Sequence, residues 1–528
     1  MKTRFCILAN GPDGTLTALW NKIPRQTIIT FISAIICGFF THGFMFANKF
    51  LNHDDIGHLF GSDYGVASGR WLLPSMLKLD GAISMPWLIG IISLILLALV
   101  ACITVSLLRI KTTASCILTA ALITVFPTVG ATFTYMFSAD VYFLSLLFAC
   151  LAVFLTVRYR FGMISGIVLI ALSMGIYQSY FCTAAALFVL VLILEVLDGK
   201  STPKVFAIRA GTFLATLGLG MGLYYAIVKI TTQSTGLVDY MGLSTMGELS
   251  FAHLPRLTFN AYKSYHNLYN FSSPGISNLF LLIVVGLLIL STLVLGIKLL
   301  RSKKLKTWQL VVLVLLVVIL PLAGTLIYIM SPGGVHHLML YGMCFVLITP
   351  LAIYEYRLAH IKHETSRFFG MMSWVVLLSL AVLSFNYSVF TNEAYMKMQL
   401  TYEQTTAFSN RLTSAIQSNE DYDENITIVL LGRAFANVEN SPSAQLIDIQ
   451  LTGALDTESV INNYTYNIFL KNNMALPNPV IGSDANLSEA LGENPTVQSM
   501  PDYPAEGSIA LVDGYIVVRF SDWWKLYE

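Results

Sequence analysis

The chain has 528 residues, of which 55% are hydrophobic and only 12% are charged. Its mean hydropathy is +0.68, and soluble domains carry about 25% charged residues on average. This composition excludes a soluble globular enzyme and predicts an integral membrane protein. The formal net charge of +1 gives no sign of a nucleic-acid partner. The seven cysteines lie mostly in apolar segments without metal-ligand spacing, so we expect neither disulfides nor a cysteine metal site.

Apolar segments along the chain are long enough to form transmembrane helices, each of which needs about 20 residues to cross the hydrocarbon core. The predicted helices cover residues 27–47, 86–108, 113–131, 140–157, 162–179, 181–197, 205–230, 276–298, 308–330, 338–356 and 369–390. The first exceeds the roughly 7–15 residues of a signal-peptide core, so we expect it to be retained. The sequence thus predicts an all-α polytopic membrane protein with about 11 transmembrane helices.

The Lys and Arg residues alternate between the two sides of this arrangement. If the N-terminus is cytoplasmic, nineteen of them fall in inside segments and six in outside loops. Cytoplasmic loops carry an excess of these residues. We therefore expect a cytoplasmic N-terminus, with the loop of residues 48–85 and the C-terminal tail on the extracytoplasmic side.

The tail after residue 390 has the composition of a globular domain. Its sequence predicts an amphipathic helix at residues 393–419 and a strand at residues 425–431. Residues 508–520 read as two short strands around Asp513-Gly514, a hairpin turn signal. We expect a transmembrane core at residues 1–390 and a small α/β extracytoplasmic domain at residues 391–528.

The loop of residues 48–85 holds two adjacent acids, Asp54 and Asp55, followed by Ser68-Gly69-Arg70-Trp71. Ionisable groups beside a bilayer often serve a function. One acid could act as a general base, while Arg70 grips a phosphate with its planar fork and Trp71 sits at the interface beside a lipid. The alternative is a solvated loop whose acids cap helices, with Arg70 paired to Asp63 or Asp80.

A divalent metal is a weaker possibility for the same loop. His53, Asp54 and His58 could bind one, since Asp54 and His58 lie one helical turn apart. The spacing fixes no further ligand, so no metal site is assigned and no cofactor is certain. His58 otherwise remains a candidate substrate contact.

Two later segments could complete a sugar site. Asp140 stands at the predicted start of a helix, where it could cap the N-terminus or bind sugar hydroxyls. Tyr177, Gln178 and Tyr180 form either a tight turn or a polar break within a longer element. Amide and aromatic side chains suit a sugar, although an interfacial aromatic belt would also explain the tyrosines.

Two further loops supply basic candidates. Arg256 and Lys263 could contact a second phosphate or the acceptor, or belong to an amphipathic helix on the membrane surface. His336 and His337 follow Gly333-Gly334, where glycine permits close approach to a ligand but is also typical of a tight turn.

Several of these motifs resemble the bacterial O-antigen-modifying membrane glucosyltransferases known as the Gtr type II family, over roughly residues 30–390. The likeness rests on His53-Asp54-Asp55, Ser68-Gly69-Arg70-Trp71, Phe137-Ser138-Ala139-Asp140 and Met174-Gly175-Ile176-Tyr177-Gln178-Ser179-Tyr180. It implies a GT-C-like architecture with an active site at the outer face. It also implies an acidic catalyst in the first outside loop, here Asp54 or Asp55.

The resemblance implies transfer of glucose, or a similar hexose, from an undecaprenyl-phosphate donor to a surface polysaccharide such as lipopolysaccharide O-antigen. The expected location is the bacterial inner membrane, and the reaction would be inverting. Partners would be the lipid-linked sugar, the glycan acceptor and the bilayer, and could include a donor-synthesising enzyme and a flippase. The rival function, a transporter or flippase of a lipid-linked sugar, predicts internal symmetry and mid-membrane charges. The acids instead cluster at one rim, which favours the enzyme.

Overall fold

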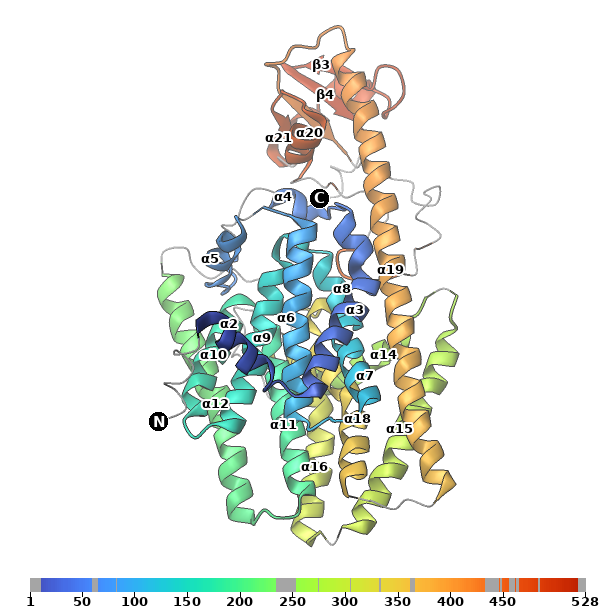
Figure 1. The fold of residues 1–528 in the computed structure, drawn as a ribbon. Coiled ribbons are helices and arrows are strands. Elements are labelled where there is room, and N and C mark those ends of the chain that lie inside the picture. The colour runs from blue at the N-terminus through green and yellow to red at the C-terminus, as the bar shows by residue number, and fades with distance from the viewer. Residues whose placement is uncertain are drawn as a thin grey trace.

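The computed structural model describes residues 11–58, 65–81, 83–233, 253–273, 275–303, 305–331, 334–360, 366–432, 446, 449–454, 461, 465–482 and 485–520. A bundle of long helices forms most of the molecule, and a small α/β body stands beyond one end of it (Figure 1). We call that end of the bundle, with the connections after α3 and before α18, the sheet end. The opposite end, with the connections after α6 and α11, is the far end.

The helices of the first half, with 3₁₀ helices labelled η, are α2 (Gly11–Trp20), α3 (Arg25–Ala47), α4 (His53–Gly57), α5 (Leu73–Leu77), η1 (Lys78–Asp80), α6 (Pro86–Leu107), α7 (Thr113–Val125), α8 (Pro127–Phe133), η2 (Met136–Ser138), α9 (Ala139–Arg158), α10 (Gly162–Ile176), η3 (Gln178–Tyr180), α11 (Phe181–Leu197) and α12 (Pro203–Thr231).

The elements of the second half are α13 (Leu254–Lys263), η4 (Ser264–His266), α14 (Asn267–Asn270), α15 (Asn278–Ser302), α16 (Thr307–Gly324), α17 (Ile327–Met330), η5 (His337–Met339), α18 (Gly342–His360), α19 (Arg367–Gln417), β1 (Ile428–Leu431), α20 (Tyr466–Met474), β2 (Val480–Ile481), α21 (Ala485–Gly492), α22 (Pro495–Ser499), β3 (Ile509–Val512) and β4 (Tyr515–Arg519).

Each of the eleven predicted membrane segments is helical, but fewer of them qualify as single spans. Within the described ranges, nine helices are long and apolar enough to cross a membrane. The pair α7 and α8, bent by 40° at Pro127, makes a tenth if it counts as one span, because proline disfavours helix in the residue before it. The segment predicted at 162–179 forms the shorter α10 and then breaks at Tyr177. The helices thus indicate a multi-pass membrane protein, and the count of about 11 spans stays a prediction.

Polar contacts join the helix ends at the far end. Arg109 Nη1 donates to Asp198 Oδ2 (2.9 Å), and the Tyr356 hydroxyl donates to Asp198 Oδ1 (3.0 Å). The carboxylate of Glu355 accepts from the backbone N–H of Lys111 (3.0 Å). These contacts join the ends of α6, α7, α11 and α18 at the end opposite the sheet.

The longest helix, α19, has 51 residues. At about 1.5 Å per residue it can cross a hydrocarbon core of about 30 Å and continue beyond it to the sheet (Figure 1). The segments predicted separately at 369–390 and 393–419 are one helix, so the predicted boundary after residue 390 falls inside it. The division into two domains at that point remains a prediction.

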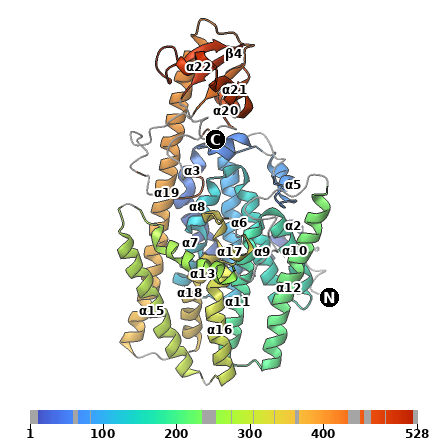
Figure 2. The ribbon, with the colours of Figure 1, turned by 180° about the vertical axis from the view of Figure 1, so that it is seen from behind.

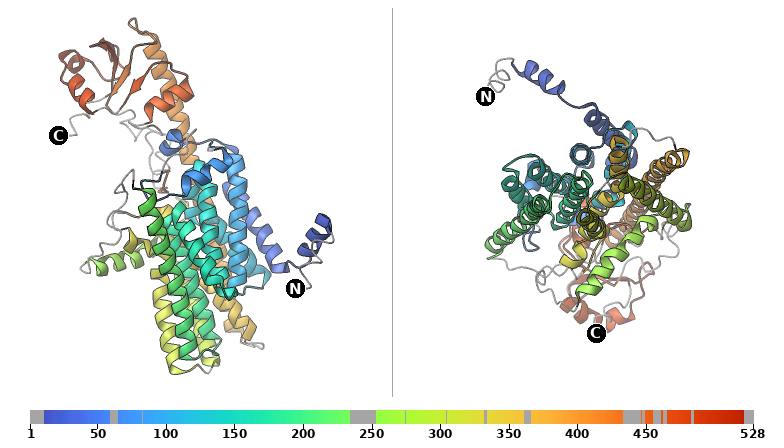
Figure 3. Two further views of the ribbon diagram at one scale, coloured as in Figure 1. Left: turned by 90° about the vertical axis from the view of Figure 1, so that its left-hand side faces the viewer. Right: turned by 90° about the horizontal axis from the view of Figure 1, so that it is seen from below.

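Buried polar contacts hold α19 against α3. His42 Nδ1 is 2.7 Å from the Tyr395 hydroxyl, and the Thr41 and Ser388 hydroxyls are 2.7 Å apart. Figure 2 shows α15 on the other side of α19, and Figure 3 shows α2 projecting sideways from the bundle.

The α/β body contains a four-stranded sheet in the order β2-β1-β4-β3. Strands β1 and β4 are parallel, whereas β3 and β4 form an antiparallel hairpin. The predicted hairpin around Asp513-Gly514 is confirmed: Asp513 has φ 49° and Gly514 φ 83°, the paired positive values of a type I′ turn. The strand predicted at residues 425–431 is observed as the shorter strand β1.

The same body shares its apolar core with the short helix α4. Leu51 and Ile56, before and within α4, are buried in one cluster with Leu412 of α19, Phe469 of α20 and Ile428 of β1. A much larger cluster fills the bundle. Helix α4 therefore lies between the bundle and the α/β body.

The orientation in the membrane is a prediction that cysteine labelling can check. In a variant without native cysteines, Glu420→Cys beside the sheet and Lys200→Cys at the far end, both exposed, should react with a membrane-impermeant maleimide from opposite sides. We expect Glu420→Cys to label from outside the cell and Lys200→Cys only after permeabilisation. The reverse pattern would place the sheet in the cytoplasm.

Candidate functional site

A cavity of about 320 Å³ opens between the loops at the sheet end. It is lined by Asp54, His58, Gly65, Ser68, Arg70, Tyr135, Phe137, Tyr142, Tyr177, His336, Leu338, Met339 and Thr452. Five predicted site residues are among them: Asp54, His58, Arg70, Tyr177 and His336. The cavity thus collects residues from five separate regions of the chain.

Helix α4 presents the two adjacent acids in opposite ways. Asn52 is its N-cap: the Asn52 side chain accepts from the Asp55 backbone N–H (2.9 Å), and Asp55 Oδ2 accepts from the Asn52 N–H (3.2 Å). Asp55 Oδ1 also accepts from the Phe137 N–H (3.2 Å) and the residue is fully buried. Burial raises the pKa of the Asp55 carboxyl to about 8, against these hydrogen bonds, which favour the charged form.

Asp54, by contrast, faces the cavity. Its side chain is 40% exposed, and Oδ1 lies 3.6 Å from His53 Nε2. The His58 ring stands 5.2 Å from that of Phe137. Burial lowers the pKa of His58, against the opposing charge of Asp54, so its imidazole is neutral at neutral pH. Of the two acids, the geometry gives Asp54 access to a ligand and gives Asp55 the support of the helix.

Arg70 reaches the cavity from a tight turn over residues 65–70. Its backbone N–H donates to the Gly65 carbonyl (2.9 Å), and Gly65 and Gly69 have φ of 94° and 76°, which favour glycine. The Arg70 guanidinium donates from Nη1 to the Tyr142 hydroxyl (3.2 Å) and lies 5.4 Å from the centre of the Tyr177 ring. Those two rings stack at 4.6 Å. The result is a cation held over an aromatic surface.

The loop that carries Arg70 is fastened to the end of α10. The Trp71 indole packs on Gly175, where an added Cβ would come within 2.5 Å of it, and the Leu72 N–H donates to the Gly175 carbonyl (2.9 Å). Gln178 Nε2 donates to the Ser68 carbonyl (3.0 Å) and to the Tyr224 hydroxyl (3.1 Å). Trp71 and Gln178 therefore position Arg70, and neither lines the cavity.

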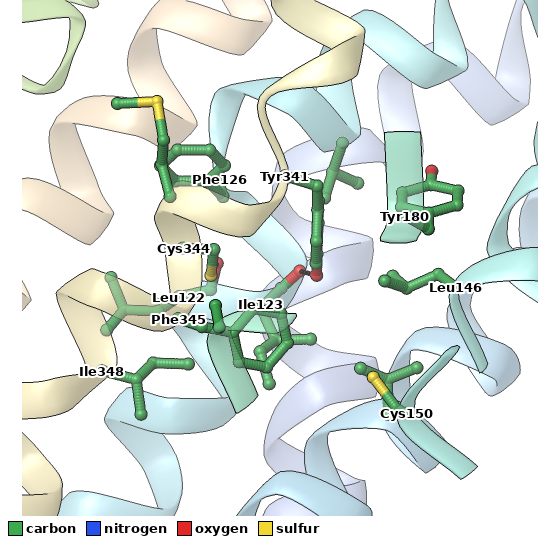
Figure 4. Close-up of a cluster of buried hydrophobic side chains, with 14 of the residues drawn as sticks. Leu122, Ile123, Phe126, Leu146, Cys150, Tyr180, Tyr341, Cys344, Phe345 and Ile348 are labelled. Atoms are coloured by element: carbon green, nitrogen blue, oxygen red, sulfur yellow. Dashed lines mark hydrogen bonds between the residues drawn. The ribbon is translucent and has the colours of Figure 1, made fainter. Parts of the chain in front are cut away.

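Other predicted site residues lie away from it. Asp140 is buried in the first turn of α9 and accepts from the Val141 N–H (2.8 Å), where an acid suits the helix dipole. Tyr180 is buried in the apolar cluster that Figure 4 shows, and its ring centre is 6.1 Å from that of Tyr341. Both predictions of a sugar contact are thus unsupported by their placement, because each side chain is packed inside the bundle.

The basic candidates for the site also differ in whether they reach the cavity. Arg256 and Lys263 lie on the exposed side of α13, whose other side packs against α16 through the hydrogen bond from the Tyr262 hydroxyl to the Val318 carbonyl (2.6 Å). They do not reach the cavity. His336 lines it, and burial lowers its pKa. His337 packs its ring against Phe271 (5.2 Å) instead, and burial lowers its pKa to about 4.

The chain as described offers no group of three or more His, Cys, Asp or Glu side chains placed to hold a metal ion. Within the described ranges, His53, Asp54 and His58 are therefore not placed together as a set of metal ligands. Asp63, one of the two acids considered as partners of Arg70, lies outside the described residues.

The residues at the site that the sequence did not predict include Tyr142, Asn52 and Thr452. Tyr142 stands two residues beyond Asp140 and carried no signal apart from that motif. Asn52 did carry one, because an Asn followed three residues later by an acid is typical of a capping box. Thr452, which lines the cavity from the C-terminal tail, had no local signal, since its contacts are with residues about 115 and 318 positions away.

The buried carboxyl of Asp55 gives a pH-dependent stability that can be measured. The unfolded carboxyl ionises near pH 3.9, so the folded protein holds an extra proton up to about pH 8, and wild-type stability falls as pH rises through that window. Histidines whose pKa is lowered by folding have the opposite effect on stability, but only below about pH 6.5, where the unfolded imidazole takes up a proton. We expect Asp55→Asn to be less stable than wild type, with a melting-temperature gap in detergent that narrows from pH 6.5 to 8. If the melting temperatures of wild type and Asp55→Asn instead changed in parallel over that pH range, the role of Asp55 would be contradicted.

Comparison with known proteins bears on the same part of the chain. The family model described as glucosyl transferase GtrII matches residues 43–349, which is more than half of the sequence and includes α4, the Arg70 loop and His336. No curated protein and no solved structure matches. The suspected likeness to the Gtr type II family is thereby confirmed, and this membrane protein belongs to the GtrII glucosyl transferase family of glycosyltransferases.

Proposed function

We propose that the protein moves glucose, or a similar hexose, from a polyprenyl-phosphate donor to a surface polysaccharide on the extracytoplasmic side of the membrane. The site lies in the cavity at the sheet end. The observation that carries this proposal is that Asp54 and Arg70, a carboxylate and a guanidinium, line one cavity. Family membership supports the transfer of a sugar.

The two charged groups suit opposite sides of a single displacement. Asp54 takes the proton from an acceptor hydroxyl, whose oxygen bonds to the anomeric carbon of the donor sugar. The bond between that carbon and the phosphate oxygen breaks, and polyprenyl phosphate leaves with the electron pair. Arg70 stabilises the phosphate by its bidentate fork. One displacement inverts the anomeric centre, through a transition state with oxocarbenium character as in glycoside hydrolysis.

The neighbouring residues support these roles. Tyr142 holds the guanidinium by its hydroxyl, and Tyr177 stacks beneath it, so the fork is oriented before the donor arrives. Such preorganisation reduces the reorganisation that charge development would otherwise require. His58 and His336, both with lowered pKa, add neutral hydrogen-bonding groups that suit sugar hydroxyls.

The proposal is tested with purified protein, polyprenyl-phosphate-glucose and surface polysaccharide from a strain that lacks the gene. We expect release of polyprenyl phosphate and a mass gain of one hexose on the polysaccharide. A flippase would move the lipid-linked sugar across vesicles without releasing polyprenyl phosphate. That outcome would replace the transferase with the transporter function.

Removing the base should abolish turnover without weakening the fold. Asp54→Asn should lower kcat by about 10²–10⁴-fold, the usual cost of losing a general base, with an unchanged melting temperature because the side chain is 40% exposed. Asp421→Asn, an exposed acid of the tail, is the matched control and should retain full activity. Near-normal turnover by Asp54→Asn would assign the base elsewhere.

Arg70 should act on the donor. Arg70→Lys keeps the charge and loses the fork, and Arg70→Ala loses both, so the donor KM should rise in that order, by about 10- to 100-fold in the second case. The acceptor KM should change little. Tyr142→Phe removes only the hydroxyl that accepts from Arg70 and should have a smaller effect. A loss of melting temperature with equal damage to donor and acceptor kinetics would mean that Arg70 only holds the loop together.

A further inference from the structure

A turn from the C-terminal tail is built into the bundle beside the cavity. In this turn, residues 451–454, the Ala454 N–H donates to the Leu451 carbonyl (2.7 Å) and Gly453 has φ 82°, as in a type II turn. Leu451 and Ala454 are buried and belong to the apolar cluster of the bundle, not to that of the α/β body. The preceding Ile449 carbonyl accepts from the fully buried Lys397 Nζ (3.0 Å).

The tip of this turn touches the elements that carry the cavity residues. Thr452 Oγ1 accepts from the His337 backbone N–H (3.1 Å), and its carbonyl accepts from the Thr134 hydroxyl. At Gly453 an added Cβ would overlap the Thr134 hydroxyl and lie 3.2 Å from Asn52 Nδ2. Asn52 is the N-cap of the helix that presents Asp54. The turn therefore wedges between α4, α8 and η5.

We propose that Thr452 contacts the glycan acceptor and selects it, which rests on the proposed function. Thr452 lines the cavity, and its oxygen accepts a hydrogen bond from the His337 N–H, which leaves its own O–H to donate elsewhere. A hydroxyl has one proton to donate, and a sugar hydroxyl at the cavity can receive it. The position beside the N-terminus of α4 is on the side of Asp54, where the acceptor must give up its proton.

The family match ends at residue 349, so this contact comes from a part of the chain outside it. The donor site at Arg70 and the acid of α4 lie within the match, whereas the acceptor contact does not. This division allows the acceptor to be selected by the tail while the chemistry stays in the bundle.

A set of variants distinguishes an acceptor contact by Thr452 from a purely structural role of the turn. Thr452→Val keeps the shape and loses the hydroxyl, whereas Thr452→Ser keeps the hydroxyl. Loss of one neutral hydrogen bond corresponds to about a 2- to 12-fold change in affinity, so Thr452→Val should raise the acceptor KM by that factor at constant donor KM, and Thr452→Ser should restore it. Thr134→Val, which loosens the same turn without lining the cavity, is the matched control and should lower the melting temperature without an acceptor-specific effect.

A second measurement does not depend on transfer. In a variant without native cysteines, Thr452→Cys is alkylated by a small maleimide, and polysaccharide from the gene-deleted strain should slow the labelling several-fold. Polyprenyl phosphate should slow it less, and labelling of Glu420→Cys should not change. If polysaccharide gives no protection, or if Thr452→Val and Thr134→Val behave alike, Thr452 is only structural. If polysaccharide protects Thr452→Cys from alkylation but the wild type transfers no hexose, the proposed reaction is wrong and the acceptor-binding site stands.

Discussion

The buried carboxyl of Asp55 is the contact on which the candidate site depends. It closes the capping box of α4 with Asn52 and accepts from the backbone N–H of Phe137 in η2, just before α9. A five-residue helix has little stability of its own, so its orientation is set by these bonds. They turn the neighbouring Asp54 toward the cavity. The two adjacent acids therefore differ in their surroundings, because only Asp55 is removed from water.

The C-terminal tail also holds α4 in place and forms part of the cavity. Leu51 and Ile56 pack into the apolar core of the α/β body, so α4 is held from that side as well as from the bundle. The tail returns once more at Thr452 to form part of the cavity wall. A helix of 51 residues, α19, carries the chain from the far end to the sheet and is joined to α3 by buried polar groups. The tail therefore contributes a residue to the wall of the candidate site and supports the helix that carries Asp54.

The arginine depends on a comparable arrangement. Gly175 leaves room for the Trp71 indole, and Gln178 binds the backbone of the Arg70 loop. Within the motif that reads in sequence as a sugar-binding surface, Gln178 fastens the loop that brings Arg70 over the tyrosine pair, whereas Tyr177 lines the cavity. The amide of Gln178 serves this purpose because a buried loop backbone needs a hydrogen-bonding partner.

The sequence by itself determined the membrane class, the position of the helical segments, the hairpin at Asp513-Gly514 and the likeness to the GtrII family. Each of these follows from local composition, periodicity or a short motif. The tertiary structure alone separated Asp54 from Asp55, placed Tyr180, Arg256 and Lys263 away from the cavity, and brought Thr452 into it. Those outcomes depend on which side chains are buried by elements distant in the chain, and burial across such distances leaves no periodic trace in a single sequence.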